Sequence, residues 1–81
     1  MRGTIKLINN KKGFIAVLTE EEEYSIIELQ RDYSPEVDDV VSGDLEGLGG
    51  ETIRNETQKQ DWSVFIQDIH ASRMMAIKEI S

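Results

Sequence analysis

The sequence predicts a small, mainly β fold in which five or six short strands close into a barrel and one short helix follows them. Two observations predict the barrel: brief runs of β-branched and apolar residues recur along residues 1–67, and turns containing glycine separate them. Closing such a sheet removes its exposed edges. A third observation predicts the helix, because the spacing of apolar residues becomes helical near residue 71.

The length and composition limit the chain to one folded domain. It has 81 residues, of which 38% are hydrophobic and 31% charged, and it has no cysteine. Because a typical domain has about 100–150 residues, residues 1–81 form a single domain, with the barrel in 1–67 and the helix in 71–80. Neither a disulfide nor a thiolate metal site can stabilise it. Since no apolar run could span a membrane and no secretory signal is present, we expect a cytoplasmic protein.

The first half of the chain predicts three strands. Thr4–Ile8 mixes β-branched and apolar residues, and Asn9–Gly13 supplies residues that tolerate the backbone angles of a tight turn. Phe14–Leu18 is too short for a helix and is typical of a buried strand. After the acidic run Glu20–Glu23, Tyr24–Leu29 predicts the third strand.

The second half predicts a loop and two or three further strands. Gln30–Asp39 contains the only proline of the chain and is expected to form a loop. Val40–Leu45 resumes a strand pattern, a glycine-rich turn follows, and Glu51–Asn55 can pair back against it. In Trp62–Ile66, alternate residues beginning with Trp62 share one face of the last strand.

The end of the chain predicts a helix over Ala71–Ile80, with Ser72 or Asp68 as its N-cap. The apolar positions that recur at helical spacing are Met74, Ile77 and Ile80, with Met75 and Ala76 beside them. A helix of this length is unstable alone, so we expect its Met and Ile face to pack on the sheet.

The net charge of −7 is unevenly distributed. Residues 1–19 contain four bases and no acid, whereas residues 20–81 contain five bases and all 16 acids. The four bases are Arg2, Lys6, Lys11 and Lys12. An acidic protein repels phosphate backbones, but salt screens charges beyond about 8 Å, so a basic hairpin can act locally.

Residues 3–29 resemble a cold-shock domain. Gly3–Asn9 matches the opening Gly-Thr-Val-Lys-Trp-Phe-Asn of that family, and Lys12–Val17 matches its first RNA-binding motif, Lys-Gly-Phe-Gly-Phe-Ile. Ser25–Leu29 aligns with its second motif, Val-Phe-Val-His-Phe. The resemblance implies a barrel of the oligonucleotide/oligosaccharide-binding (OB) type. It also implies that aromatic side chains on the sheet surface stack on bases of single-stranded RNA or DNA.

The chain departs from that family at the stacking positions. Aliphatic residues stand where the family has one Trp and three Phe, namely at Leu7, Ala16, Ile26 and Leu29. Only Phe14 remains aromatic, and Glu28 stands at the family's His position. Each stacking contact that is lost removes roughly 1–3 kcal/mol of binding free energy.

Two main hypotheses follow. In the first, the chain is a non-catalytic protein-interaction or regulatory module, and the aliphatic positions form a face that packs on an unknown protein partner or on the C-terminal helix. In the second, weak single-stranded nucleic-acid binding persists along the first hairpin through Lys6, Lys11, Lys12 and Phe14. A third possibility is weak self-association in place of a monomer.

The remaining polar motifs do not predict catalysis or a cofactor. His70 is the only histidine, so a metal or nucleophile–histidine site has little from which to assemble. The Glu20–Glu23 run lacks the spacing and glycine of a calcium loop and is typical of a solvated segment. Asp38-Asp39 reads as the start of a strand. We therefore expect no enzyme activity, no cofactor and no metal.

Overall fold

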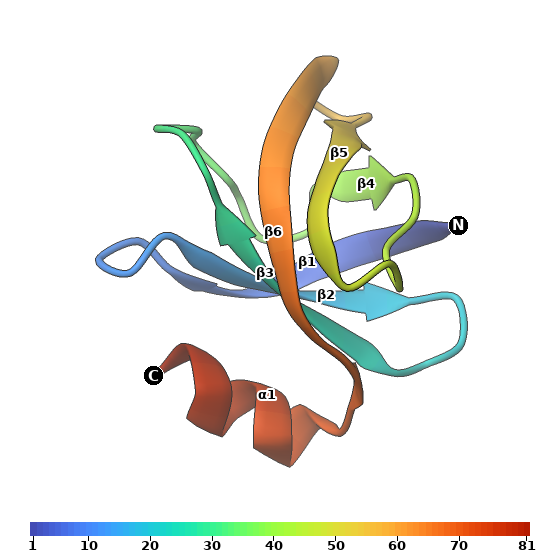
Figure 1. Ribbon diagram of the computed structural model, residues 1–81, viewed down its shortest axis with the longest axis vertical. Coiled ribbons are helices and arrows are strands. Elements are labelled where there is room, and N and C mark those ends of the chain that lie inside the picture. The colour runs from blue at the N-terminus through green and yellow to red at the C-terminus, as the bar shows by residue number, and fades with distance from the viewer.

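Six antiparallel strands form a closed barrel, and a short helix packs against its outside (Figure 1). The computed structural model describes residues 1–81. The elements are β1 (Arg2–Asn9), β2 (Phe14–Thr19), β3 (Tyr24–Leu29), β4 (Val40–Ser42), β5 (Gly49–Asn55), β6 (Gln60–Ala71) and α1 (Arg73–Ile80). Around the barrel the order is β1-β2-β3-β6-β5-β4, and β4 pairs with β1 to close it. The prediction of a mainly β barrel with one C-terminal helix is confirmed.

The last strand is longer than the sequence pattern predicted. β6 continues to Ala71, which pairs with Tyr24 of β3, so α1 begins at Arg73 and not at residue 71. Between this pair and the pair of Ile27 with Ile66, β6 has two more residues than β3, which makes two bulges. Bulges bend a strand. The end of β6 accordingly curves toward α1 (Figure 1).

Alternating residues of all six strands fill the barrel interior. The ten buried members of this core are Ile5, Ile15, Val17, Ile27, Val41, Leu45, Ile53, Trp62, Val64 and Ile66. Leu45 comes from the β4–β5 loop, because β4 ends at Ser42 and does not continue as predicted. Trp62, the largest of these residues, is fully buried, and it shares the interior face with Val64 and Ile66, as the alternation in Trp62–Ile66 predicted.

The loop between β3 and β4 covers the Trp62 end of the barrel. The Tyr33 ring stacks on the Trp62 indole with centroids 5.0 Å apart and planes inclined by 14°. The Tyr33 hydroxyl also accepts a hydrogen bond from the backbone N–H of Ser63 at 2.8 Å. This loop is therefore part of the core packing.

Asp39 anchors the other end of that loop through a buried polar network. Its Oδ2 atom accepts hydrogen bonds from Asn55 Nδ2 at 2.9 Å and from Gln58 Nε2 at 2.8 Å. The backbone N–H of Glu36 donates to the same oxygen at 3.1 Å. Asn55 is fully buried, so it has no access to water in place of Asp39. The sequence pattern gave no sign of this role.

The helix buries a different face from the one that its apolar spacing predicted. Ala76 and Ile80 are buried, whereas Met74 and Ile77 are exposed, so the expectation of a buried Met74–Ile77–Ile80 stripe is wrong. Ser72 caps the helix as predicted, accepting a hydrogen bond from the Met75 N–H. Because β6 delivers the chain at this cap, the cap fixes which side of α1 meets the sheet. No helix of the protein has the length and apolar character needed to cross a membrane.

We expect Asp39→Ala to lower the free energy of unfolding by about 1–3 kcal/mol, because it leaves buried donors without an acceptor. Urea unfolding followed by Trp62 fluorescence measures this change. Asp61→Ala is the matched control, since Asp61 is exposed and pairs only with Arg54 at 3.0 Å. Its effect should stay below about 1 kcal/mol. Equal losses in the two variants would contradict the assigned role of Asp39.

Candidate binding surface

The outer surface of β1, β2 and β3 carries a second apolar cluster, and α1 lies on it. We call the outward side chains of these strands in this cluster the covered face: Leu7, Phe14, Ala16, Leu18, Tyr24 and Ile26. Ala76 and Ile80 of α1 and Ala71 of β6 complete the cluster. The helix therefore occupies the surface on which the cold-shock resemblance would place bases.

The strand register brings three of the four predicted aliphatic positions together. Leu7 pairs with Ala16, and Ala16 pairs with Ile26, so the three side chains form a row across β1, β2 and β3. Ala16 and Ile26 are fully buried beneath α1. Their small and aliphatic side chains let the helix approach the sheet closely.

Leu29 does not belong to this row, which corrects the prediction that it shares the helix-docking face. It is the next residue after Glu28, whose partner Phe14 lies on the covered face, and neighbouring residues of a strand point to opposite sides. Leu29 accordingly packs, partly buried, against the core inside the barrel.

The basic residues predicted to bind nucleic acid do not form one free surface. Lys6 Nζ donates to Asp38 Oδ1 at 2.9 Å. Lys12 Nζ donates to the Ser81 carbonyl oxygen beyond the end of α1. Phe14 packs partly buried against the cluster beneath the helix. Lys11 and Lys12 are both exposed and form no ion pair, and of the three lysines only Lys11 also lacks a side-chain hydrogen bond.

Polar contacts hold the two ends of α1 against the sheet. Near its start, Arg73 Nη1 donates to the Tyr24 hydroxyl at 3.0 Å. At its end, Asn9 Nδ2 donates to the Ile80 carbonyl oxygen. Asn9 lies at the end of β1, so the helix spans the covered face from β3 to the first hairpin. These bonds satisfy polar groups that a docked helix would otherwise leave unpaired.

One contact between α1 and the barrel brings two carboxyl groups together. Glu79 of α1 faces Asp68 of β6, and the hydrogen bond between the two carboxyl groups, together with partial burial, raises the pKa of Glu79 above its usual value. Glu79 Oε2 is closed to solvent and accepts no hydrogen bond from a donor group of the protein. The pair is most favourable when one of the two groups carries a proton.

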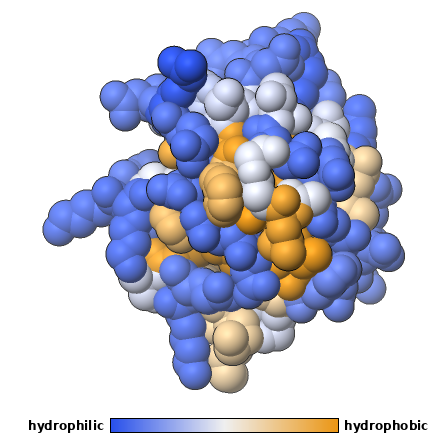
Figure 2. All heavy atoms as spheres, viewed as in Figure 1, coloured by the Kyte–Doolittle hydropathy of each residue, from blue (hydrophilic) through white to orange (hydrophobic).

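The outward side of α1 carries an exposed apolar surface. Met74, Met75 and Ile77 are 70%, 47% and 46% exposed. Met74 and Ile77 are three residues apart and thus neighbours on the helix. In the view of Figure 2, hydrophilic atoms cover most of the surface, and separate apolar areas interrupt them over β6 and α1. We call these three residues the helix ridge.

Comparisons of the chain with models of protein families, with curated proteins and with solved structures gave no match. The function must therefore be inferred from the surfaces described above.

We expect Ala76→Glu to detach α1, because it places a carboxylate in a fully buried contact and the helix is too short to be stable alone. Amide hydrogen exchange in residues 75–80 should become at least about tenfold faster. Met74→Glu, at an exposed position of the same helix, is the control and should leave the exchange nearly unchanged. Unaltered protection in Ala76→Glu would show that α1 is held by other contacts.

We expect Glu79→Gln to raise the melting temperature at pH 7 and to have little effect at pH 4. The pKa of Glu79 is higher in the folded protein than in the unfolded chain. Protonated Glu79 therefore stabilises the fold at a pH below the usual pKa of a Glu, and this stabilisation is lost as the pH rises through the folded-state pKa. The amide removes the repulsion and can donate to Asp68. Thermal unfolding by circular dichroism measures both values. Glu51→Gln, with the same charge change away from α1, controls for net charge, and a destabilised Glu79→Gln at pH 7 would contradict this assignment.

Proposed function

We propose that the protein is a non-catalytic protein-binding module, and that the helix ridge is the surface that a partner protein contacts. One observation carries this proposal: α1 covers the outer surface of β1, β2 and β3 with Ala76 and Ile80 while Met74, Met75 and Ile77 stay exposed. The finer likeness of residues 3–29 to a cold-shock domain of the OB type is part of the same proposal. In this proposal, a docked helix covers the sheet surface that carries base-stacking aromatic residues in the cold-shock family.

The composition of the covered face supports this exchange. Base stacking needs flat rings, and the row of Leu7, Ala16 and Ile26 has none. Phe14 retains an aromatic ring but packs against the buried cluster under the helix. Opening this face would expose the buried side chains of Ile26 and Ile80, and exposing each costs about 1.5–3 kcal/mol.

The exposure of the helix ridge supports binding of a protein. Apolar side chains that lie side by side on a surface mark interaction sites, whereas single exposed ones need no explanation. Methionine suits such a site because its unbranched, polarisable side chain adapts to the shape of a partner. The covered sheet surface then has a structural role, and the helix presents the binding residues.

The alternative of single-stranded nucleic-acid binding has weaker support. Lys11 and Lys12 lie near Arg31 around a shallow hollow, which gathers positive charge at the tip of the first hairpin. However, Asp32 also lines this hollow, and Lys6 pairs with Asp38. The phosphate contacts that remain are too few for strong, salt-dependent binding by an otherwise acidic chain.

We expect the double substitution Met74→Ser and Ile77→Ser to abolish partner binding without unfolding the barrel, because both side chains are exposed. Affinity purification with quantitative mass spectrometry, followed by titration of the purified partner, should show at least about tenfold weaker binding. The matched control is Val37→Ser with Leu48→Ser, which removes two apolar side chains that are 56% and 61% exposed elsewhere.

The proposal would be overturned if the helix-ridge variant bound the partner as well as the control does. Saturable binding of a short single-stranded oligonucleotide at low micromolar concentration, with chemical-shift changes clustered in residues 6–16, would favour the alternative instead.

A further inference from the structure

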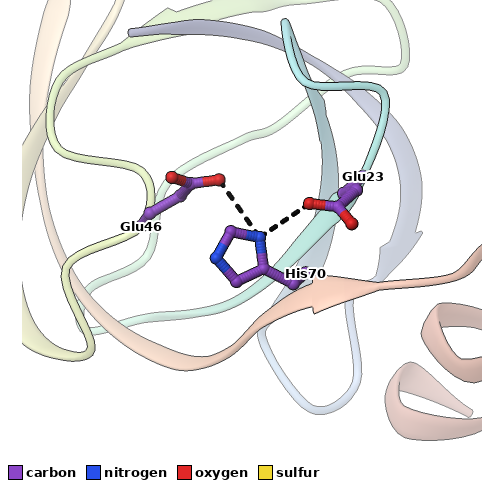
Figure 3. A group of neighbouring side chains, drawn as sticks. All are labelled: Glu23, Glu46 and His70. Atoms are coloured by element: carbon purple, nitrogen blue, oxygen red, sulfur yellow. Dashed lines mark hydrogen bonds and ion pairs between the residues drawn. The ribbon is translucent and has the colours of Figure 1, made fainter.

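Three side chains that can bind a metal ion converge beside the end of β6 (Figure 3). His70 Nδ1 lies 2.7 Å from Glu23 Oε1 and 3.4 Å from Glu46 Oε2. One ligand atom from each of the three residues lies within 4.8 Å of the other two. Figure 3 shows the two carboxylates pointing at the same ring nitrogen, Glu46 from one side and Glu23 from another.

The three residues come from different parts of the chain, and the strand pairing brings them together. Glu23 directly precedes Tyr24, which pairs with Ala71, and His70 is the neighbour of Ala71. Glu46 lies in the loop between β4 and β5. His70 has a positive φ of 56°, which few non-glycine residues adopt. It lies within a bulge of β6, between the paired residues Asp68 and Ala71, and bulges redirect side chains.

The arrangement lacks a cation to balance its charge when His70 is neutral. Two carboxylates that face one another repel, and the rest of the Glu20–Glu23 run adds negative potential nearby. In addition, Glu46 Oε2 is closed to solvent and accepts no hydrogen bond, since its separation of 3.4 Å from His70 Nδ1 is long for one. A buried carboxylate oxygen without a donor has room in its hydrogen bonding for a water molecule or a cation.

A proton on Nδ1 is one cation that this position can hold. Carboxylate oxygens of Glu23 and Glu46 lie within 3.4 Å of that nitrogen, so negative charge surrounds the point where the three side chains meet. A metal ion of charge +2 would balance both carboxylates, whereas one proton balances only one.

We propose that Glu23, Glu46 and His70 bind a divalent first-row transition-metal ion such as Zn²⁺, with His70 Nδ1 and one oxygen of each carboxylate as ligands. Imidazole nitrogen and carboxylate oxygen are both ligands of Zn²⁺, at about 2.0–2.2 Å. Tetrahedral ligand atoms at these bond lengths are about 3.3 Å apart, so the 3.4 Å between His70 Nδ1 and Glu46 already fits, and the 2.7 Å between His70 Nδ1 and Glu23 has to lengthen. His70 and Glu23 are 52% and 46% exposed, which leaves room for water as the remaining ligand.

Such an ion would connect the β2–β3 turn, the β4–β5 loop and the end of β6. It would thereby fix the segment from which α1 begins, because His70 is close in sequence to the cap Ser72. This inference does not depend on the proposed protein-binding function, since the helix ridge contains none of the three ligands.

Isothermal titration of the full chain with zinc chloride at pH 7.5 tests the proposal, with cobalt(II) absorption as a second readout. We expect one ion per chain. His70→Asn and Glu46→Gln should each weaken zinc binding at least about tenfold, because each removes a ligand and the loss of a residue that merely orients a ligand already costs about that much. Asn is chosen at position 70 because it tolerates the left-handed backbone there. Zinc should also shift the ¹⁵N resonance of His70 Nδ1.

The matched control is Glu22→Gln, which makes the same charge change in the same turn and should leave the affinity nearly unchanged. Circular dichroism of each variant shows that it is folded. The proposal is overturned if zinc does not bind saturably, or if His70→Asn binds it as tightly as the original chain. It is also overturned if His70 stays protonated on both ring nitrogens when zinc is added, which would leave an ion pair without metal.

Discussion

The packing of Ala76 and Ile80 against Ala16 and Ile26 determines which surfaces of the barrel other molecules can reach. Each strand of the closed barrel has an inner and an outer face, and the inner faces already pack together in the core around Trp62. The apolar residues on the outside of β1, β2 and β3 therefore need a second layer. The helix supplies that layer from within the same chain, and the contact costs no loss of translational freedom, unlike binding of a separate partner.

The bulged end of β6 connects the helix contact with the group of Glu23, Glu46 and His70. The same strand end directs α1 across the covered face and carries His70 toward Glu23 and Glu46. The helix then presents Met74 and Ile77 to solvent on one side of the molecule. The helix ridge and the proposed metal site can thus coexist on one small barrel. They lie on different sides of the segment from the end of β6 into α1, and the two extra residues of β6 set the path of that segment.

Sequence patterns predicted strands better than they predicted surfaces. β-branched and apolar runs around a turn located the first hairpin, and period-two alternation placed Trp62, Val64 and Ile66 on one face, which fills the barrel interior. The alignment with the cold-shock family placed Leu29 on the wrong surface, because aligned positions take no account of the reversal in side-chain direction between Glu28 and Leu29. The helical spacing of Met74, Ile77 and Ile80 was misleading for a different reason: the cap and the path of β6, and not hydrophobicity alone, orient a helix of eight residues.

The sequence by itself determined the order of strands and helix, the barrel class and the aliphatic row of Leu7, Ala16 and Ile26, because these follow from residue type and local periodicity. Only the tertiary structure decided that α1 covers that sheet, that Asp39 is a buried acceptor, and that His70 meets two glutamates. These contacts join residues up to 71 positions apart. Their formation depends on strand register and bulges, which cooperative pairing around the whole barrel sets and no local segment encodes.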